Sequence, residues 1–183
     1  MPSKKEIRLE MARRKRALSV AYKDTASQCL CRQLLSMSII QKARVILLYY
    51  ALPDEISLTP LLEMLYKEEN PPILLLPVVK GEELELRSYQ GADSLQTGGA
   101  YGILEPIGET FTKYSSIEVA LIPGVAFNES GIRLGRGKGF YDRLLPHLIQ
   151  AHKIGVCFPC QLLESIPYEP HDISMDCVII PED

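Results

Sequence analysis

The sequence predicts an α/β fold with a mostly parallel sheet. The runs Val45–Tyr50 and Ile73–Val79 are apolar on both faces, which is typical of parallel strands buried between helices. Segments with helical spacing alternate with these runs, and such alternation indicates parallel strands joined by helices. The chain has 183 residues, 46% of them hydrophobic and 23% charged, so it has room for one ordinary domain with a substantial core.

Two helices are predicted within the first forty residues. Ile7, Met11 and Leu18 mark the buried side of the first, and Asp24 is a candidate cap for the second. The later predicted elements are a helix from Ser57 to about Glu68 with Pro60 in its first turns, a more exposed strand at Leu84–Arg87, a short strand at Glu118–Ile122, a helix from about Gly139 to Gln150 that Pro146 kinks or divides, and strands at Lys153–Val156 and Cys177–Ile180. The irregular, glycine-rich region from about Gly91 to Thr112 is long for a connection, so we expect a functional or mobile segment such as a flap over a site.

Charge and hydropathy exclude several classes of protein. Lysine and arginine number 20 and acidic residues 23, and the resulting net charge of −3 argues against a general nucleic-acid binder, which usually carries a basic domain. No apolar run approaches the roughly eighteen residues of a membrane helix. The amino-terminal residues MPSKKEIRLEMARRKR contain no apolar core, so we expect no secretory leader.

The chain has five cysteines, and their spacing allows two functional roles besides a structural one. Cys157 and Cys160 form a C-x-x-C motif after a strand-like run, which fits a thioredoxin-type redox pair, or half of a zinc site completed by Cys29 and Cys31. An odd number of cysteines without a mark of export argues against a disulfide framework. Four of the five lie among apolar neighbours, and a thioredoxin fold would place its motif near the start of the chain. We therefore interpret the cysteines as small apolar residues of the core.

The most informative segment runs from Gly131 to Arg143, with the sequence GIRLGRGKGFYDR. We call its first part, Gly131 to Gly139, the glycine loop. Its glycines let the backbone approach an anion and present N–H groups to it, and the helix predicted next adds positive potential. The basic residues of the segment outnumber its one acid, Asp142: they are Arg133, Arg136, Lys138 and Arg143. A phosphate-rich ligand fits this local excess of positive charge.

Known phosphate-binding motifs do not match the glycine loop. The Walker pattern needs glycine where Ile132 stands and serine or threonine where Gly139 stands. The dinucleotide pattern fails as well, because the spacing here is G-x-G-x-G. On pattern alone, a flexible surface turn with solvated charges is an equal alternative.

The residues after the glycine loop favour a ligand site over a surface turn. Phe140 and Tyr141 are adjacent aromatics that would pack poorly on a solvated turn, whereas a flat heterocycle would stack on them. Asp142 follows directly and could hold Mg²⁺, which usually takes one or two carboxylates together with phosphate oxygens.

At these residues the sequence resembles the 5-formyltetrahydrofolate cyclo-ligase family, also called methenyltetrahydrofolate synthetase. The resemblance spans nearly the whole chain, and the glycine loop with Tyr141-Asp142 is its specific part. The other matching segments are Lys4 to Arg8, the acidic turn Asp54-Glu55, Gly102 to Pro106, Pro123 to Phe127, Ile154 to Val156, Gln161-Leu162, Ile166-Pro167, and His171-Asp172 through Asp176. Phe140 departs from the family, which often has tyrosine there, and Lys138 stands where a small residue is common.

The resemblance implies the fold, the reaction and its cofactors. It implies a three-layer α/β/α arrangement over a single cyclo-ligase domain, residues 1–183. The reaction would convert 5-formyltetrahydrofolate to 5,10-methenyltetrahydrofolate with release of ADP and phosphate, using ATP as co-substrate, Mg²⁺ as cofactor and a phosphorylated formyl intermediate. We expect small-molecule partners (ATP and a reduced folate), no nucleic acid, no membrane, a cytoplasmic location, and a monomer or weak dimer.

The resemblance also implies roles for individual residues. Arg136 and Tyr141 would be catalytic, and Asp142 and Asp176 would bind the metal. ATP would be bound by Lys4, Lys5, Arg8, Arg133, Leu134, Gly135, Arg136, Gly137, Lys138, Gly139, Phe140 and Tyr141. The folate would be bound by Tyr50, Leu52, Glu55, Phe140 and Tyr141. His171 is interpreted as structural.

Each role has a simpler alternative that the sequence leaves open. Lys4 and Arg8 lie one helical turn apart and could form a solvated basic face. Glu55 could cap the helix predicted near Ser57, and Asp176 could be a turn residue before a strand. For the protein as a whole, the alternatives are a redox or zinc module built on Cys157 and Cys160, and a non-catalytic phosphate-binding domain.

Overall fold

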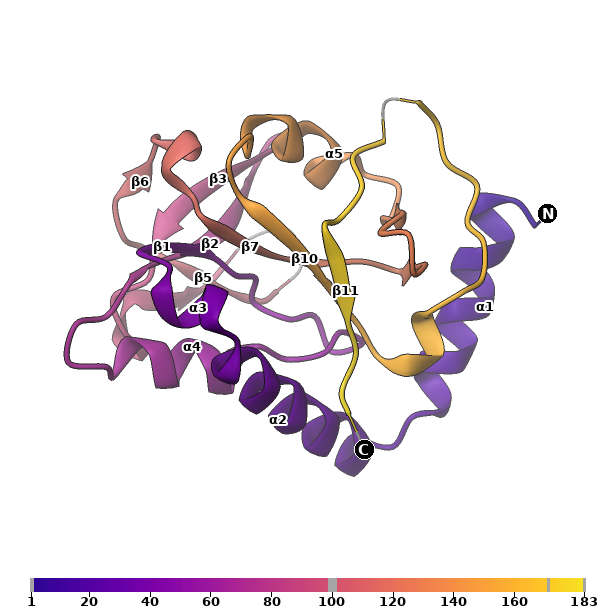
Figure 1. The fold of residues 1–183 in the computed structure, drawn as a ribbon, viewed down its shortest axis with the longest axis horizontal. Helices are drawn as coiled ribbons and strands as arrows, with labels where there is room; N and C mark the ends of the chain where they lie inside the picture. Colours follow the sequence, from indigo (N-terminus) through magenta and orange to yellow (C-terminus); the bar gives the residue numbers. More distant parts are fainter. Residues whose placement is uncertain (1, 99–101, 171, 183) are drawn as a thin grey trace.

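The computed structural model describes residues 2–98, 102–170 and 172–182, and confirms the α/β fold with a mostly parallel sheet. The central sheet has seven strands in the order β11-β10-β7-β1-β2-β3-β6 (Figure 1). Their bounds are β1 Val45–Leu47, β2 Ile73–Lys80, β3 Glu83–Ser88, β6 Thr110–Phe111, β7 Val119–Pro123, β10 His152–Val156 and β11 Cys177–Ile179. All neighbours pair in parallel except β2 with β3 and β3 with β6.

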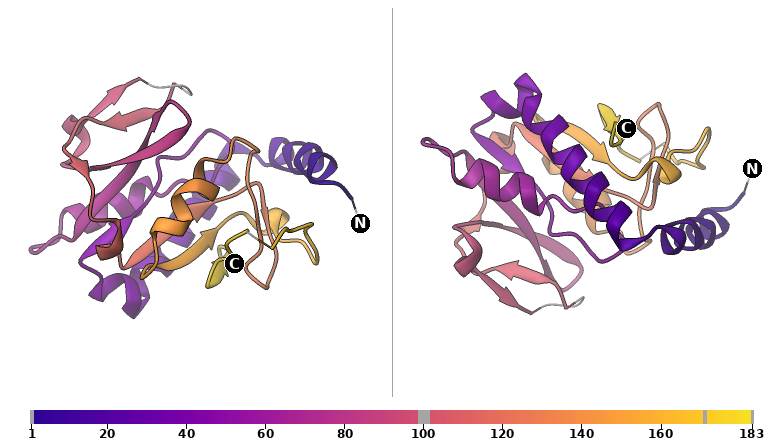
Figure 2. Two further views of the ribbon diagram at one scale, coloured as in Figure 1. Left: turned by 90° about the horizontal axis from the view of Figure 1, so that it is seen from above. Right: turned by 90° about the horizontal axis from the view of Figure 1, so that it is seen from below.

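Helices cover both faces of this sheet. Their bounds are α1 Lys4–Ala17, α2 Val20–Ser36, α3 Ser38–Lys42, α4 Thr59–Tyr66 and α5 Phe140–Leu144. The two views of Figure 2 show α2, α3 and α4 on one face and α5 on the other. Among the helices of the described residues, none is both long and apolar enough to cross a membrane.

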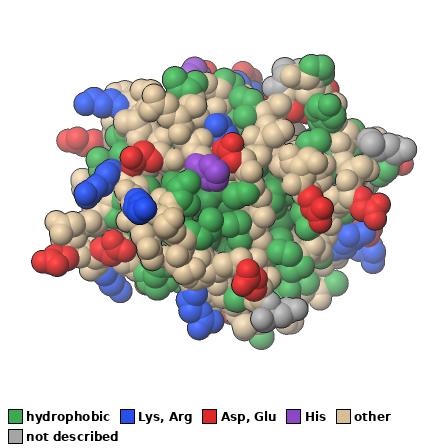
Figure 3. Space-filling view, viewed as in Figure 1, with side chains coloured by type: hydrophobic (Ala, Val, Ile, Leu, Met, Phe, Trp, Pro, Cys, Tyr) green, Lys and Arg blue, Asp and Glu red, His purple; other side chains and the backbone are tan. Residues whose placement is uncertain are grey.

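The core consists of two layers divided by the sheet. Alternate residues of each strand point to opposite faces, so Ile46 packs with α2 and α4, while its neighbour Leu47 packs with α5. The first layer includes Leu30, Leu34, Leu61, Leu65, Leu74 and Leu121, and the second includes Leu75, Ala120, Ile122, Leu144 and Leu148. On the face where β11 lies, hydrophobic side chains gather at the centre and charged ones surround them (Figure 3).

Helix α1 lies at the side of this sandwich (Figure 1). Ile7 and Met11 pack with Val125, Ala126 and other residues around the hairpin of β8 (Ala126–Phe127) and β9 (Arg133–Leu134). A capping box fixes the first turn of α1, because Ser3 accepts a hydrogen bond from the Glu6 amide and the Glu6 carboxylate accepts one from the Ser3 amide. The packing of Ile7 and Met11 thus holds the helix beside the hairpin whose second strand belongs to the glycine loop.

Several expected boundaries are wrong, each for a local reason. Asp24 does not cap the second helix: Ser19 does, because its hydroxyl accepts from the Tyr22 amide five residues earlier than expected. The strand expected at 45–50 ends at Leu47. The helix expected over 139–150 stops at Leu144 and continues as a 3₁₀ turn, Leu145–His147, because Pro146 has no amide hydrogen to donate.

The region expected to be irregular between residues 91 and 112 is partly regular. Strands β4 (Leu95–Thr97) and β5 (Leu104–Pro106) pair in antiparallel fashion, and β6 adds to the edge of the central sheet. Residues 99–101 of this region lie outside the described residues. That it moves as a flap stays a prediction.

Gly155 in β10 gives a test of this packing. A Cβ atom at Gly155 would lie 2.5 Å from a ring carbon of Phe127, which is fully buried. Gly155→Ala is therefore expected to lower the free energy of unfolding by about 1–3 kcal/mol through overpacking, measured by urea denaturation. Adding Phe127→Leu should recover part of the loss, and a Gly155→Ala protein as stable as wild type would contradict the packing described.

Candidate active site

A cavity opens where the sheet reverses its order. From β1 the chain proceeds to β2 and β3 on one side, then crosses to β7 and β10 on the other, so the switch point lies between β1 and β7. Ligands of such sheets bind outside the carboxyl ends of the strands at this point. Tyr49 and Tyr50 follow β1, Pro123 ends β7 and Gly124 comes directly after it. All four line the cavity.

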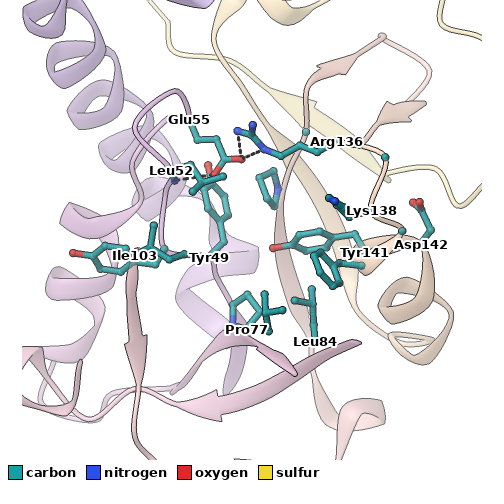
Figure 4. Close-up of a pocket in the computed structure, with 18 of the residues that line it drawn as sticks. Tyr49, Leu52, Glu55, Pro77, Leu84, Ile103, Arg136, Lys138, Tyr141 and Asp142 are labelled. Carbon is teal, nitrogen blue, oxygen red and sulfur yellow. Dashed lines mark hydrogen bonds and ion pairs between the residues drawn. The ribbon is translucent and has the colours of Figure 1, made fainter. Parts of the chain in front are cut away.

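The glycine loop forms one wall of this cavity (Figure 4). Its first part includes β9, which pairs with β8, and Gly139 at its end is the residue from which α5 begins. Gly137 and Gly139 have φ of 91° and 72°, a region that side chains with a Cβ rarely adopt, so the loop needs glycine at both positions. The backbone between them can therefore approach a ligand closely.

Helix α1 brings only part of its predicted cationic face to the loop. The Arg8 Nε atom donates to the Gly135 carbonyl at 2.9 Å, and its guanidinium lies beside Gly137. Lys4 instead pairs with Glu169 and Asp172 near the carboxyl terminus, at 3.2 and 3.3 Å. Lys5 is exposed, and neither lysine lines the cavity.

The acidic turn faces the glycine loop across the cavity, and Arg136 joins the two. Its Nη2 atom lies 2.5 Å from Asp54 Oδ1 and 2.9 Å from Glu55 Oε1. The second oxygen of Glu55 accepts a hydrogen bond from the Leu52 amide at 3.0 Å. Burial lowers the pKa of Arg136, but the nearby carboxylates of Glu55 and Asp54 outweigh burial and raise it. Arg136 therefore stays protonated at neutral pH and forms ion pairs with both side chains.

Arg133 is the most deeply buried cation of the cavity wall. Its side chain is 5% exposed, and its guanidinium lies over the Tyr141 ring, 5.2 Å from the ring centre. Its Nε atom has no hydrogen-bond partner within the part of the chain that the structure describes, and its only ion pair there is with Asp142 at 3.5 Å. Burial lowers its pKa, although an arginine remains protonated at neutral pH. A buried guanidinium with a free donor can bind an anion.

Aromatic and apolar side chains form the rest of the cavity. Figure 4 shows Tyr49 and Tyr141 approaching it from opposite sides, with the Tyr141 hydroxyl pointing inward. The Tyr49 hydroxyl donates to the Ile56 carbonyl, so this side chain is held in place. Burial, followed by the charge of Glu55, raises the pKa of Tyr141, so its phenol stays protonated and can donate a hydrogen bond.

The residues predicted to bind the folate all line this one cavity: Tyr50, Leu52, Glu55, Phe140 and Tyr141. Of the residues predicted to bind ATP, those between Arg133 and Tyr141 line the same cavity, with the exception of Leu134. The Leu134 side chain is instead buried in the apolar cluster beneath helix α1. The structure thus places the cationic loop and the acidic turn on opposite walls of a single site.

Of the two predicted metal ligands, Asp142 lines the cavity and Asp176 does not. The Asp142 side chain is 60% exposed. Asp176 lies at the amino end of β10 and β11, where its carboxylate accepts from the Lys153 amide, whereas the cavity lies at the carboxyl ends of the neighbouring strands. Within the described ranges, no group of three or more His, Cys, Asp or Glu residues could hold a metal. His171 lies outside the described residues.

The comparisons with known proteins agree with this geometry. Residues 1–181 match the model of the 5-formyltetrahydrofolate cyclo-ligase family. The chain belongs to this family. It is 31% identical to the 5-formyltetrahydrofolate cyclo-ligase of Mycolicibacterium smegmatis, over 98% of this chain and 94% of that protein.

Solved structures of cyclo-ligase relatives have the same fold. The 5,10-methenyltetrahydrofolate synthetase of Aquifex aeolicus superposes with a TM-score of 0.86 at 33% identity, covering 98% of this chain and 90% of that one. The synthetase of Mycoplasma pneumoniae gives a TM-score of 0.80 at 26% identity, covering 99% of this chain and all of that one. The resemblance to the cyclo-ligase family is thereby confirmed.

Sequence reasoning missed part of the cyclo-ligase cavity. Its apolar floor is formed by Pro77 and Val79 of β2 and Leu84 of β3, and a further wall comes from Ile103 and Glu105 around β5. The segment Gly102 to Pro106 matched the family in its amino-acid sequence. Its pattern of apolar and polar residues, however, did not indicate that it would line the cavity.

The C-x-x-C motif offers little for redox or zinc chemistry in this cyclo-ligase. Burial raises the pKa of Cys157 to about 12 and also raises that of Cys160, so neither is a reactive thiolate at neutral pH. All five cysteines are free, and the thiols of Cys29 and Cys31 contact the carbonyls of Glu182 and Ser57. Burial of Cys31 and Cys157 agrees with a role in the core.

Asp54 gives a test of the ionic network. Burial raises the pKa of this carboxyl, but hydrogen bonds from Lys15 and Arg136 outweigh burial and hold it below the ordinary 3.8. The network therefore stabilises the fold above pH about 4, and this stability is lost as the pH falls through the folded pKa. In urea titrations, the stability difference between wild type and Asp54→Asn should be constant near neutral pH and shrink below about pH 4. A difference that does not change with pH would contradict the network.

Proposed function

We propose that the protein closes the ring of 5-formyltetrahydrofolate to form 5,10-methenyltetrahydrofolate, with ATP as co-substrate and Mg²⁺ as cofactor. Membership of the family supports the folate reaction, and the cavity supports the nucleotide. In this proposal residues 1–183 act as one catalytic domain, as a monomer or weak dimer, in the cytoplasm. The partners are ATP and a reduced folate.

The glycine loop is the proposed binding site for the phosphates. Its backbone, Arg133 and Lys138 line the cavity, and Arg8 braces the loop from outside through the Gly135 carbonyl. The free Nε donor of Arg133 is buried and suits a phosphate oxygen. This set of donors is what the triphosphate of ATP requires.

Glu55 of the acidic turn is the proposed binding residue for the pterin. The Glu55 side chain is 10% exposed, and its carboxylate is oriented by the Leu52 amide and Arg136. An oriented carboxylate can accept two hydrogen bonds from the adjacent N–H groups of a pterin. Tyr50, Phe140 and Tyr141 then enclose the ring that carries the formyl group.

The chemistry requires activation of a poor electrophile. The formyl oxygen attacks the γ-phosphorus of ATP, so a new O–P bond forms and the bond to ADP breaks. The neighbouring folate nitrogen N10 then attacks the formyl carbon, the C–O bond breaks, phosphate leaves, and the N10 proton passes to solvent. No protein nucleophile is needed, so catalysis depends on positioning and on stabilising charge.

This chain's residues supply that stabilisation. Arg136 stands between the two walls and is placed to neutralise charge on the phosphoryl group in transfer. The Tyr141 phenol points into the cavity and can donate to the reacting oxygens. Asp142 beside the glycine loop is an exposed carboxylate that fits Mg²⁺, which would neutralise phosphate charge when bound. Asp176 has no part in this proposal, because it does not line the cavity and its carboxylate accepts a hydrogen bond from the Lys153 amide.

One observation supports the proposal most strongly. Arg136 of the glycine loop lies 2.9 Å from Glu55 of the acidic turn, so a nucleotide bound by the first and a pterin bound by the second would meet. A phosphate-binding domain without catalysis would not need a second, carboxylate-bearing wall.

The direct test is to incubate the purified protein with ATP, Mg²⁺ and 5-formyltetrahydrofolate and to follow the absorbance of the methenyl product. Product should form only when all three are present. Asp142→Ala should fold normally, judged by circular dichroism, yet lose at least about 100-fold in kcat, because phosphate charge is left uncompensated. An inactive wild-type protein would refute the proposed reaction, and an Asp142→Ala enzyme of normal rate would refute the metal assignment.

Glu55→Ala tests the folate wall separately. Loss of the Glu55 carboxylate removes its charged hydrogen bonds to the pterin, so the KM for 5-formyltetrahydrofolate should rise about 10–100-fold. The KM for ATP should change by less than about threefold. Glu68→Ala removes an exposed acid outside the cavity and serves as the control for net charge. A Glu55→Ala enzyme with an unchanged folate KM would reject the assignment.

A further inference from the structure

Lys15 is a charged residue on the buried side of an amphipathic helix. The buried positions of α1 are Ile7, Met11 and Lys15, spaced by four residues, and the first two belong to an apolar cluster. The Lys15 side chain is 2% exposed. Burying an ammonium group costs free energy unless it is paired, and a leucine or methionine would continue the stripe without that cost.

The partner of Lys15 is the carboxylate that also holds Arg136. The Lys15 ammonium lies 2.5 Å from Asp54 Oδ2, while Arg136 occupies Oδ1. The two cations differ in exposure to solvent. The Lys15 side chain is buried and lies on a helix, whereas the Arg136 side chain is 39% exposed and lies on the glycine loop. Asp54 is therefore shared between a fixed cation and one that has room to move.

We infer that Lys15 is a positioning residue, which holds and neutralises Asp54 so that Arg136 can move from that carboxylate to the phosphoryl group. The inference rests on the proposed function, in which Arg136 stabilises the transfer. Without Lys15, Arg136 would be the one remaining cation that pairs with Asp54 within the described part of the chain. The carboxylate would then compete with the phosphates for the same guanidinium.

Lys15→Met tests the inference, because it removes the ammonium and keeps the length of the side chain. We expect kcat to fall about tenfold and the KM for ATP to rise, since Arg136 is withheld from the phosphates. The Kd of 5-formyltetrahydrofolate, measured by calorimetry without ATP, should stay within about twofold, and its stoichiometry counts the folded molecules. Lys15→Arg restores the charge and should retain most of kcat.

The double variant Lys15→Met/Asp54→Asn separates competition from simple loss of structure. It removes both charges, so Arg136 has no carboxylate of Asp54 to compete for it, and kcat should return to within about threefold of wild type. If Lys15→Met alone fails to fold, the kcat of this double variant still tests the role of Lys15. A folded double variant that remains about tenfold slow, or a folded Lys15→Met enzyme with the kcat of wild type, would overturn the role of Lys15. A wild-type protein that forms no product would instead refute the proposed function.

Discussion

The ion bridge from Arg136 to the acidic turn is the interaction that joins the two walls of the site and fixes where their charges lie. The guanidinium leaves the glycine loop and donates to both Asp54 and Glu55, at 2.5 and 2.9 Å. It is the direct side-chain link across a cavity whose walls come from residues about eighty positions apart in sequence. Because two carboxylates face one guanidinium, the second negative charge of the turn must be balanced from elsewhere, and the Lys15 ammonium on α1 pairs with Asp54.

The fold explains why these walls meet. The sheet changes direction between β1 and β7, so the acidic turn after β1 and the hairpin after β7 leave the sheet side by side. Helix α1 lies outside the layers and braces the glycine loop through Arg8. A loop rich in glycine has little structure of its own, and its conformation therefore depends on these neighbours.

Much of this arrangement could be predicted from the sequence. Runs that are apolar on both faces identified β1 and β2, and the four glycines with basic residues identified the loop. That Asp176 does not line the cavity could not be predicted in the same way, because its place depends on the pairing of β11 with β10. Ile103 and Glu105 were missed because their place follows from the pairing of β5 with β4, which no periodicity in that segment indicates.

In the proposed reaction the cavity brings ATP and the folate together, and the formyl oxygen itself receives the phosphoryl group. The most direct measurement uses 5-formyltetrahydrofolate with ¹⁸O in the formyl group and follows the label by mass spectrometry of the released phosphate. Each released phosphate should carry one labelled oxygen, and this phosphate should form in step with the methenyl product. Methenyl product accompanied by unlabelled phosphate would contradict it.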